Sequence, residues 1–238
     1  MSGGPGLAVV TGASGGIGAA VARRLSAVGH PVLVMARRSR ALAELGLDDV
    51  VVAGVDVREH DAVRAAVEEA VERYGPVQIL VNNAGVMSLG NVATQDLDEW
   101  RTTFDVNLLA SVALTRLVLS SMLGRGCGTV VFVSSIAARQ VFGHHAAYCA
   151  SKAATHALAD ATRLEAAPAG VRVVEVAPGY VATDLIASTS DGALRSDYRA
   201  QVDVALDPDA VAATVEWACS LPAEVCVREV HVAHARQP

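Results

Sequence analysis

Seven short apolar runs, separated by longer alanine-rich stretches, constrain the fold more than any other feature of the sequence. Such short runs are typical of β-strands, and most of the stretches between them have the apolar spacing of amphipathic helices. Strands and helices in alternation indicate βαβ units and a parallel sheet. The runs cover residues 7–11, 31–35, 50–55, 78–82, 129–134, 171–177 and 226–233.

Two of these runs indicate how the sheet is covered. Val50-Val-Val-Ala53 and Val130-Val-Phe-Val133 are apolar at every position. Strands that carry helices on both faces have this pattern, whereas half-exposed strands alternate. With 238 residues and 52% hydrophobic content, the chain can build one sizeable core. We therefore expect one domain, residues 1–238, with a three-layer, doubly wound α/β fold around a seven-stranded parallel sheet.

Charge and composition exclude several kinds of partner. The net charge is −6 and no long basic run occurs, so we expect neither nucleic acid nor an anionic membrane as a partner. The start, MSGGPGLAVV, lacks a signal-peptide pattern, and no run of about 18 apolar residues occurs, which predicts a soluble, cytoplasmic protein. Four cysteines without a C-x-x-C pair predict buried thiols rather than a zinc site or disulfides.

The sequence TGASGGIG, from Thr11 to Gly18, directly follows the first apolar run. Glycines between a strand and a helix leave backbone N–H groups free to face an anion at the positive end of the helix. This pattern predicts a pyrophosphate site, although a plain turn would have the same composition. The residues we assign to this cofactor site are Gly12, Ser14, Gly15, Gly16, Ile17 and Gly18.

The second apolar run ends at Ala36 and is followed by Arg37 and Arg38. An acidic side chain at this place would accept hydrogen bonds from the adenosine ribose, whereas guanidinium groups would pair with a 2′-phosphate. The sequence therefore favours NADPH over NADH, the alternative being a solvated basic turn. Asp56 and Asn83 end the next two runs and are candidates for cofactor contacts, or turn residues.

Tyr148 and Lys152 lie four residues apart in an expected helix over 146–167, so they share one face. An ammonium beside a phenol lowers the phenol pKa from about 10, which would make Tyr148 a usable acid or base. A purely structural pair has the same spacing. Ser135 ends a strand thirteen residues earlier and could either donate a hydrogen bond to a substrate oxygen or cap a helix.

Together these motifs resemble the short-chain dehydrogenase/reductase family, in order and in spacing. The matching segments are TGASGGIG, NNAG, DVNLLA, Ser134-Ser135, YCASK and PGYVAT, and they extend over nearly the whole chain. The resemblance implies a Rossmann fold and a nicotinamide cofactor. It also implies a catalytic tetrad of Asn107, Ser135, Tyr148 and Lys152.

The resemblance implies a nicotinamide-dependent oxidoreductase, and the roles that follow are those for the direction that reduces a ketone or aldehyde. Ser135 would hold the substrate oxygen and Tyr148 would protonate it. Lys152 would lower the pKa of Tyr148 and hold the nicotinamide ribose, while Asn107 would fix a water that passes protons to Lys152. No metal is expected, because hydrogen bonds would stabilise the oxyanion. The further cofactor contacts that it implies are Asp56, Val57, Asn83, Ala84, Gly85, Pro178, Gly179, Val181 and Thr183.

The chain departs from the family pattern at two places. Gly15 stands where the glycine loop often has a basic residue, so a preference for NADP(H) would depend on Arg37 and Arg38. The common C-terminal TG…VDGG signature is missing. The chain's own ending is similar to that of the branch with 3-hydroxy-acid dehydrogenases and clavulanate-type aldehyde reductases.

For the substrate we expect contacts from Ser135, Val141, Tyr148 and Tyr180, with Val86, Met87, Gln140 and Phe142 nearby and a mobile flap at about 184–207. This mostly apolar set suits a small or medium neutral carbonyl compound. A carboxylate-bearing substrate would instead need Arg139, Arg195 or Arg199.

Three alternatives stay open at this point. The first is an NAD-linked alcohol or 3-hydroxy-acid dehydrogenase that works toward oxidation. The second is a catalytically silent dinucleotide sensor, and the third an isomerase or epimerase. In each case the family resemblance implies a homodimer or homotetramer, assembled through long helices at about 99–123 and 146–167.

Overall fold

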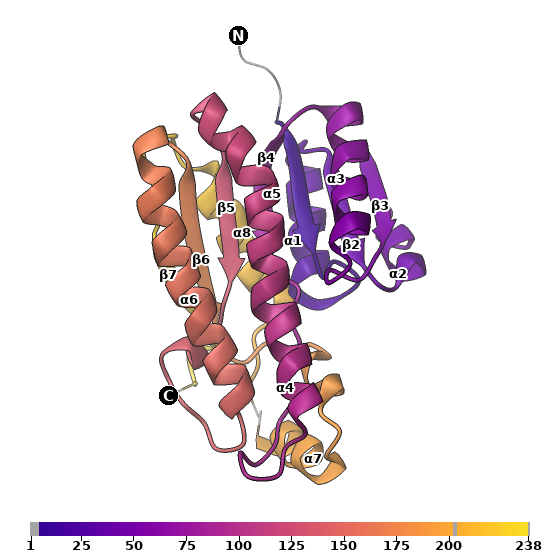
Figure 1. Cartoon of the computed structure of the whole chain (residues 1–238), viewed down its shortest axis with the longest axis vertical. Helices are drawn as coiled ribbons and strands as arrows, with labels where there is room; N and C mark the ends of the chain where they lie inside the picture. The colour runs from indigo at the N-terminus through magenta and orange to yellow at the C-terminus, as the bar shows by residue number, and fades with distance from the viewer. Residues whose placement is uncertain (1–4, 202–203, 238) are drawn as a thin grey trace.

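The computed structural model describes residues 5–201 and 204–237 and has the predicted α/β fold in a single domain (Figure 1). The sheet has seven parallel strands in the order β3-β2-β1-β4-β5-β6-β7. All seven predicted strands are confirmed, most of them within one or two residues of the expected ends. They are β1 (Leu7–Thr11), β2 (Val32–Ala36), β3 (Val50–Gly54), β4 (Val77–Asn82), β5 (Thr129–Val133), β6 (Arg172–Pro178) and β7 (Glu229–Val232).

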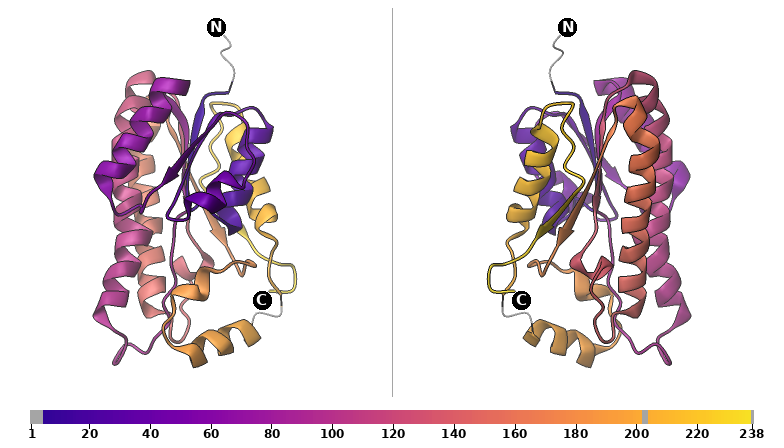
Figure 2. Two further views of the ribbon diagram at one scale, coloured as in Figure 1. Left: turned by 90° about the vertical axis from the view of Figure 1, so that its right-hand side faces the viewer. Right: turned by 90° about the vertical axis from the view of Figure 1, so that its left-hand side faces the viewer.

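Helices cover both faces of the sheet (Figure 2), which confirms the prediction for β5, where every residue is buried. The same prediction is wrong for β3, because this strand lies at the edge of the sheet and alternates between buried and exposed residues, with Val52 38% exposed. On one face lie α3 (His60–Tyr74), α5 (Ala110–Arg125) and α6 (Ala146–Ala166), and on the other α1 (Gly16–Ala27) and α8 (Pro208–Ser220). The remaining helices are α2 (Ser39–Ala43), α4 (Leu97–Phe104) and α7 (Gly192–Gln201), together with the π-helical turn η1 (Asp105–Leu109) and the 3-10 turns η2 (Ile136–Ala138), η3 (Ala167–Ala169) and η4 (Leu185–Ser188).

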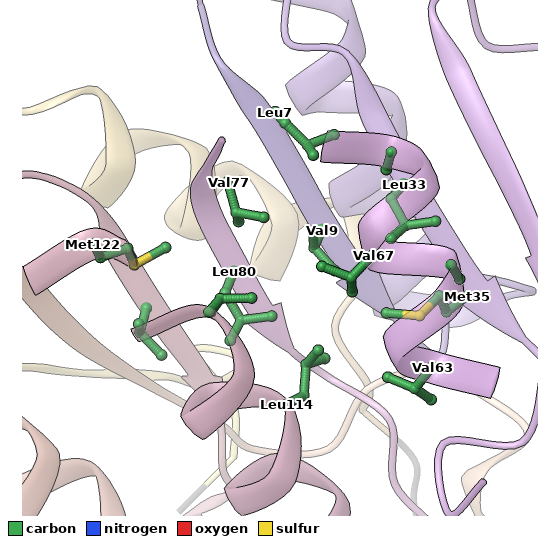
Figure 3. Close-up of a cluster of buried hydrophobic side chains, with 14 of the residues drawn as sticks. Leu7, Val9, Leu33, Met35, Val63, Val67, Val77, Leu80, Leu114 and Met122 are labelled. Carbon is green, nitrogen blue, oxygen red and sulfur yellow. The ribbon is translucent and has the colours of Figure 1, made fainter. Parts of the chain in front are cut away.

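Strand side chains divide between two cores because successive residues point to opposite faces. In β1, Leu7 and Val9 enter the core that α3 and α5 cover, where Val67 and Leu114 meet them (Figure 3). Ala8 and Val10 enter the other core, which α1 and α8 cover. Every β1 residue is buried, so each position of the strand has to be small or apolar.

The direction of winding reverses beside β1, which lies between β2 and β4. Loops that leave β1 and β4 at the carboxyl edge therefore diverge and leave a crevice between them. All strands are parallel, so the loops after β5 and β6 open at the same edge. In Figures 1 and 2 this edge faces α7.

The expected helix over 99–123 is an extended helical stretch, Leu97–Arg125, interrupted by η1. By length and composition this stretch could cross a membrane, but its inner side packs on the sheet. Leu114, Val118 and Met122 belong to the core on that face. We therefore interpret the stretch as a core helix of the fold. The cytoplasmic location stays a prediction.

The stretch at 184–207, which the sequence presents as irregular, contains η4 and α7. A single bridge between Val181 and Leu206 returns the chain to the end of β6. Residues 202 and 203 of this stretch lie outside the described residues. The four cysteines are free, but only Cys149 is fully buried, whereas Cys127 and Cys226 are exposed, contrary to the prediction of buried thiols.

Candidate active site

The glycine turn after β1 has a backbone that other residues would strain. Gly12 has φ +67° and Gly16 has φ +53°, in the left-handed region that favours glycine. A Cβ on Gly12 would lie 2.9 Å from Ala84 Cα, and one on Gly16 would lie 2.9 Å from Thr183 Cγ2. The turn thus passes tightly between the loops after β4 and β6. The first turn of α1 has no acidic residue and no side-chain cap, so its N–H groups are available to an anion.

Hydrogen bonds of the Thr11 and Asn83 side chains fix this turn to the loop after β4. Thr11 Oγ accepts hydrogen bonds from the backbone N–H groups of Asn83 at 3.0 Å and Ala84 at 2.9 Å. Asn83 Nδ2 donates to Thr11 O at 2.8 Å. The motifs TGASGGIG and NNAG, more than 60 residues apart in the sequence, are therefore parts of one structural unit. The role of Thr11 was not predicted, because the contact depends on the sheet order.

Basic groups surround the end of the cleft that would take the adenosine. Arg38 folds back over the glycine turn, and its Nη2 donates to Ser14 O at 3.1 Å and to Ser14 Oγ at 3.2 Å. Arg37 is exposed beside it. Asp56 also lines this end, but Arg58 donates to both of its carboxylate oxygens. This hydrogen-bonded ion pair, with Arg37 nearby, holds the pKa of Asp56 below its usual range.

Ser135, Tyr148 and Lys152 meet at the opposite end of the cleft. Ser135 Oγ accepts a hydrogen bond from Ala137 N at 3.1 Å, so the residue caps η2. Its own hydrogen points to no backbone acceptor and is available to the Tyr148 oxygen or to a substrate oxygen. Lys152 Nζ donates to Val133 O at 2.9 Å and lies 5.8 Å from the centre of the Tyr148 ring. The end of β5 thereby positions both the serine and the lysine against the tyrosine.

Burial dominates the acid–base properties of this pair. It raises the pKa of Tyr148 to about 12, which a hydrogen bond with Ser135 offsets in part. It lowers the pKa of Lys152 to about 8, against the effect of the Glu175 carboxylate. The predicted depression of the Tyr148 pKa is thus not found in the protein chain without its cofactor, because burial of the phenol outweighs the hydrogen bond with Ser135.

Asn107 lies in η1, behind the cleft lining. Its Oδ1 accepts from Val86 N at 2.8 Å, and its Nδ2 donates to Val86 O at 3.0 Å and to Ser151 Oγ at 2.9 Å. It thus joins the loop after β4 to α6. A Cβ on Gly85 would lie 3.4 Å from Asn107 Oδ1 and 3.8 Å from Lys152 Nζ, so this glycine keeps the space between the two side chains open.

One cleft of about 780 Å³ connects the two ends. Most residues assigned to the cofactor line it: Gly12, Ser14, Gly15, Gly16, Ile17, Arg37, Arg38, Asp56, Val57, Asn83, Ala84, Gly85, Tyr148, Lys152, Pro178, Gly179, Val181 and Thr183. Gly18 does not line the cleft. A Cβ there would lie 2.5 Å from Asn83 Nδ2, so Gly18 serves the packing of α1 against this loop.

At the substrate end the structure differs from the prediction in two loop residues, Gln140 and Val141, neither of which lines the cleft. Tyr180 lines the cleft as predicted, but Val141 is 85% exposed and lies outside the lining. Its neighbour Phe142 takes that place, together with His145 and Tyr198. Tyr198 belongs to α7 and was missed, because only tertiary structure brings the flap over the cleft.

The three arginines considered for a substrate carboxylate do not line the cleft. Arg139 donates to both carboxylate oxygens of Glu229, at 2.9 and 2.7 Å. Arg195 donates to the backbone oxygen of Thr189 at 3.2 Å. Arg199 is exposed on α7. The described part of the chain thus offers a carboxylate-bearing substrate none of the predicted partners.

A separate polar cluster lies outside the cleft lining. His156, Glu175 and Glu229 hold ligand-type atoms within 4.8 Å of one another. Each residue already has a protein partner: His156 Nδ1 lies 2.6 Å from Glu175 Oε2, and Glu229 is paired with Arg139. We interpret the cluster as a partly buried, hydrogen-bonded polar network that joins β6, β7 and α6, with Glu175 as its buried member. The absence of a metal requirement stays a prediction.

Comparison with known proteins agrees with this geometry. A family model described as short chain dehydrogenase matches residues 6–193. Glycine betaine reductase of Emericella nidulans is 41% identical over 98% of this chain, which spans only 19% of that relative's length. An uncharacterized oxidoreductase of Staphylococcus saprophyticus is 35% identical, and the match covers 95% of this chain and 96% of the relative.

A solved structure also matches nearly the whole chain. It is an alcohol dehydrogenase from the archaeon Thermococcus sibiricus complexed with 5-hydroxy-NADP. The TM-score is 0.86 at 27% identity, with 98% of each chain covered. A protein of this architecture thus binds a nicotinamide dinucleotide derivative. The similarity to the branch of 3-hydroxy-acid dehydrogenases and clavulanate-type aldehyde reductases stays a prediction.

Proposed function

Because the chain belongs to the short chain dehydrogenase family, we propose that it is an NADPH-dependent oxidoreductase that reduces a ketone or aldehyde to an alcohol. The observation that carries this proposal is the convergence of Ser135, Tyr148 and Lys152 at one end of the cleft whose other end holds the glycine turn. A single extended cofactor bound along this cleft would bring its reactive ring to the three side chains.

In the proposed reaction, NADPH held by the residues of the cleft would supply the hydride for the carbonyl carbon. Tyr148 donates its phenolic proton to the carbonyl oxygen, to which Ser135 also donates a hydrogen bond. Lys152 returns a proton to Tyr148, and Asn107 positions the water that supplies it. Hydrogen bonds and proton transfer stabilise the developing oxyanion, so this mechanism needs no metal.

Two features support NADPH as the preferred cofactor. Arg37 and Arg38 lie beside Ser14 at the adenosine end, where they can pair with a 2′-phosphate. Ala36 replaces the acidic residue that would bind the ribose hydroxyls of NADH and repel a phosphate. The alternative within the same chemistry is an NAD-linked alcohol or 3-hydroxy-acid dehydrogenase that works toward oxidation.

The experiment is a substrate panel with NADPH and NADH in parallel, followed by absorbance of the reduced cofactor. The panel contains apolar ketones, diketones, quinones, aldehydes, 3-oxo esters and semialdehyde acids. It also contains carbonyl compounds with a quaternary ammonium group, because the relative at 41% identity is named glycine betaine reductase.

The control is Tyr148→Phe, which removes the proton donor and keeps the ring. We expect this variant to bind NADPH with an affinity close to that of the wild type and to lose at least 1,000-fold in kcat. Substantial residual reduction by the variant would contradict the mechanism. NADPH binding without turnover of any panel member would instead favour the second class of function, a catalytically silent dinucleotide sensor.

A further inference from the structure

Aromatic side chains concentrate at the substrate end of the cleft, although they form only 4% of the sequence. Of the four tyrosines, Tyr148, Tyr180 and Tyr198 line the cleft, together with Phe142 and the imidazole of His145. These residues come from the loop before α6, from α6, from the loop after β6 and from α7. The fold therefore gathers rings from separate segments around one place.

We call Phe142, His145, Tyr180 and Tyr198 the aromatic cluster. Its ring centres lie 5.6 Å apart between Phe142 and His145, 5.9 Å between His145 and Tyr198, and 6.0 Å between Tyr198 and Tyr180. The rings are tilted or edge-on to one another, with interplanar angles of 49° to 73°. All four are half-buried, so they still expose surface toward the cleft.

The charges around the aromatic cluster favour a cation. Among the described residues that line the cleft, the arginines are Arg37, Arg38 and Arg58, all at the adenosine end. Asp184 contributes a carboxylate to the lining near η4. Burial lowers the pKa of His145, so its imidazole is neutral at neutral pH and does not repel a positive charge. Lys152 is the remaining cation in the lining. In the proposed reaction its ammonium group acts on Tyr148 and not on the substrate.

We infer that the aromatic cluster binds a quaternary ammonium group, so that the preferred substrates are aldehydes or ketones that carry a trimethylammonium substituent close to the carbonyl. A quaternary ammonium has no N–H to donate and is recognised chiefly by the negative faces of aromatic rings. This inference rests on the proposed function, because the same Tyr148 that protonates the carbonyl oxygen lies beside the cluster.

The chemistry at the carbonyl is unchanged by this group. Hydride adds to the carbonyl carbon, a proton passes from Tyr148 to the oxygen, and NADPH becomes NADP⁺. The carbon–nitrogen bonds of the trimethylammonium group stay intact. The aromatic cluster therefore acts on substrate binding, and its effect belongs in KM more than in kcat.

The test compares two aldehydes of the same shape, with the full chain and saturating NADPH. Trimethylammonioacetaldehyde carries the cation, and 3,3-dimethylbutanal has a carbon in place of the nitrogen. Concentrations are expressed as free carbonyl, measured by NMR, because the cationic aldehyde is more hydrated. We expect kcat/KM to be at least 10-fold higher for the cation, with most of the difference in KM.

Two variants at one position separate the ring from its hydroxyl. Tyr198→Leu removes a ring of the cluster and should lower the ratio of the two kcat/KM values at least 5-fold. Tyr198→Phe keeps the ring and should hold the ratio within 2-fold of the wild type. Because each variant is judged by a ratio, a general loss of stability or activity does not imitate the expected result.

The outcomes separate this inference from the function on which it rests. If both aldehydes are reduced in a Tyr148-dependent way and the ratio of their kcat/KM values is near one, the quaternary ammonium site is overturned. The proposed carbonyl reductase activity is then still supported. A ratio that Tyr198→Leu leaves unchanged also overturns the site. If neither aldehyde is reduced, the ammonium site is overturned. If the wider panel fails as well, the proposed function fails with it.

Discussion

Arg37 and Arg38 are neighbours in sequence but have different surroundings. Arg38 is hydrogen-bonded to Ser14, whereas Arg37 makes no side-chain hydrogen bond or ion pair within the described residues. Arg37 is therefore the guanidinium that can turn to a 2′-phosphate without breaking an existing contact. The sequence predicts both arginines at this edge, but their different partners depend on the distance between two loops.

We predict that Arg37→Asp erodes the cofactor preference. Losing a charge-assisted hydrogen bond of about 1.5–3 kcal/mol should lower kcat/KM for NADPH roughly 10- to 100-fold and leave the value for NADH nearly unchanged. The control is Arg40→Asp, because Arg40 is exposed, paired with Glu44 and outside the cleft lining. If the ratio of kcat/KM for NADPH to kcat/KM for NADH is unchanged in Arg37→Asp, the 2′-phosphate binds at another place in the protein.

The pKa values of Tyr148 and Lys152 lead to a second prediction at this scale. With a pKa of about 12, Tyr148 stays protonated through neutral and mildly alkaline pH. With a pKa of about 8, Lys152 is cationic below that pH and loses the proton it passes to Tyr148 above it. Reduction should therefore be constant from about pH 6.5 to 7.5 and fall tenfold per pH unit well above 8.

The measurement is kcat/KM for one substrate between pH 6 and 10 at saturating NADPH. Cofactor binding is followed separately by fluorescence at each pH, because the 2′-phosphate itself titrates near pH 6. A profile that stays flat to pH 10 would contradict the relay through Lys152. A fall in NADPH binding that parallels the fall in activity would assign the pH effect to the cofactor instead.

Elements differ in how fully their local sequence determines them. The strands could be predicted because burial on both faces demands apolar side chains at nearly every position, as in LAVVT of β1 and TVVFV of β5. The π-helical turn η1 could not, because DVNLL has no local helix-breaking residue. Its register is set by the hydrogen bonds of Asn107 to Val86 and Ser151, which come from other elements.

Gly16, at the start of α1, and Gly124, within α5, allow a matched prediction about the effect of alanine on stability. Gly16→Ala puts a Cβ at φ +53° and 2.9 Å from Thr183 Cγ2, so we expect a loss of about 1–2 kcal/mol in unfolding free energy and at least tenfold weaker NADPH binding. Gly124→Ala, in α5, meets nothing within 4 Å and should add about 0.5–1 kcal/mol. Urea unfolding measures both, and equal effects of the two substitutions would contradict the strained turn.

The whole molecule shows why the candidate site was easier to predict than its substrate end. The cofactor motifs directly follow β1, β2, β3 and β4, and a parallel sheet brings all these ends to one edge. Tyr198 and His145 lie on segments whose paths no local pattern predicts. The long cofactor cleft was therefore predictable from the strands, whereas the aromatic cluster depends on how α7 folds over the edge.

The two long helices on one face leave apolar side chains at the surface. Leu109 is 51% exposed at the end of η1, Val112 is 36% exposed in α5, and Leu164 is 79% exposed in α6. Exposed large apolar residues along neighbouring surface helices are typical of an interface between subunits. We therefore predict a homodimer or homotetramer that buries this face.

Light scattering coupled to size-exclusion chromatography measures the mass in solution. Leu109→Glu should reduce it to that of a smaller assembly, because an unpaired carboxylate would be buried at the contact. Val28→Glu is the matched control, since Val28 is 47% exposed at the end of α1 on the opposite side of the sheet. A wild-type monomer at micromolar concentration would contradict the prediction. So would an unchanged mass for Leu109→Glu, because the subunits would then have to meet through another face.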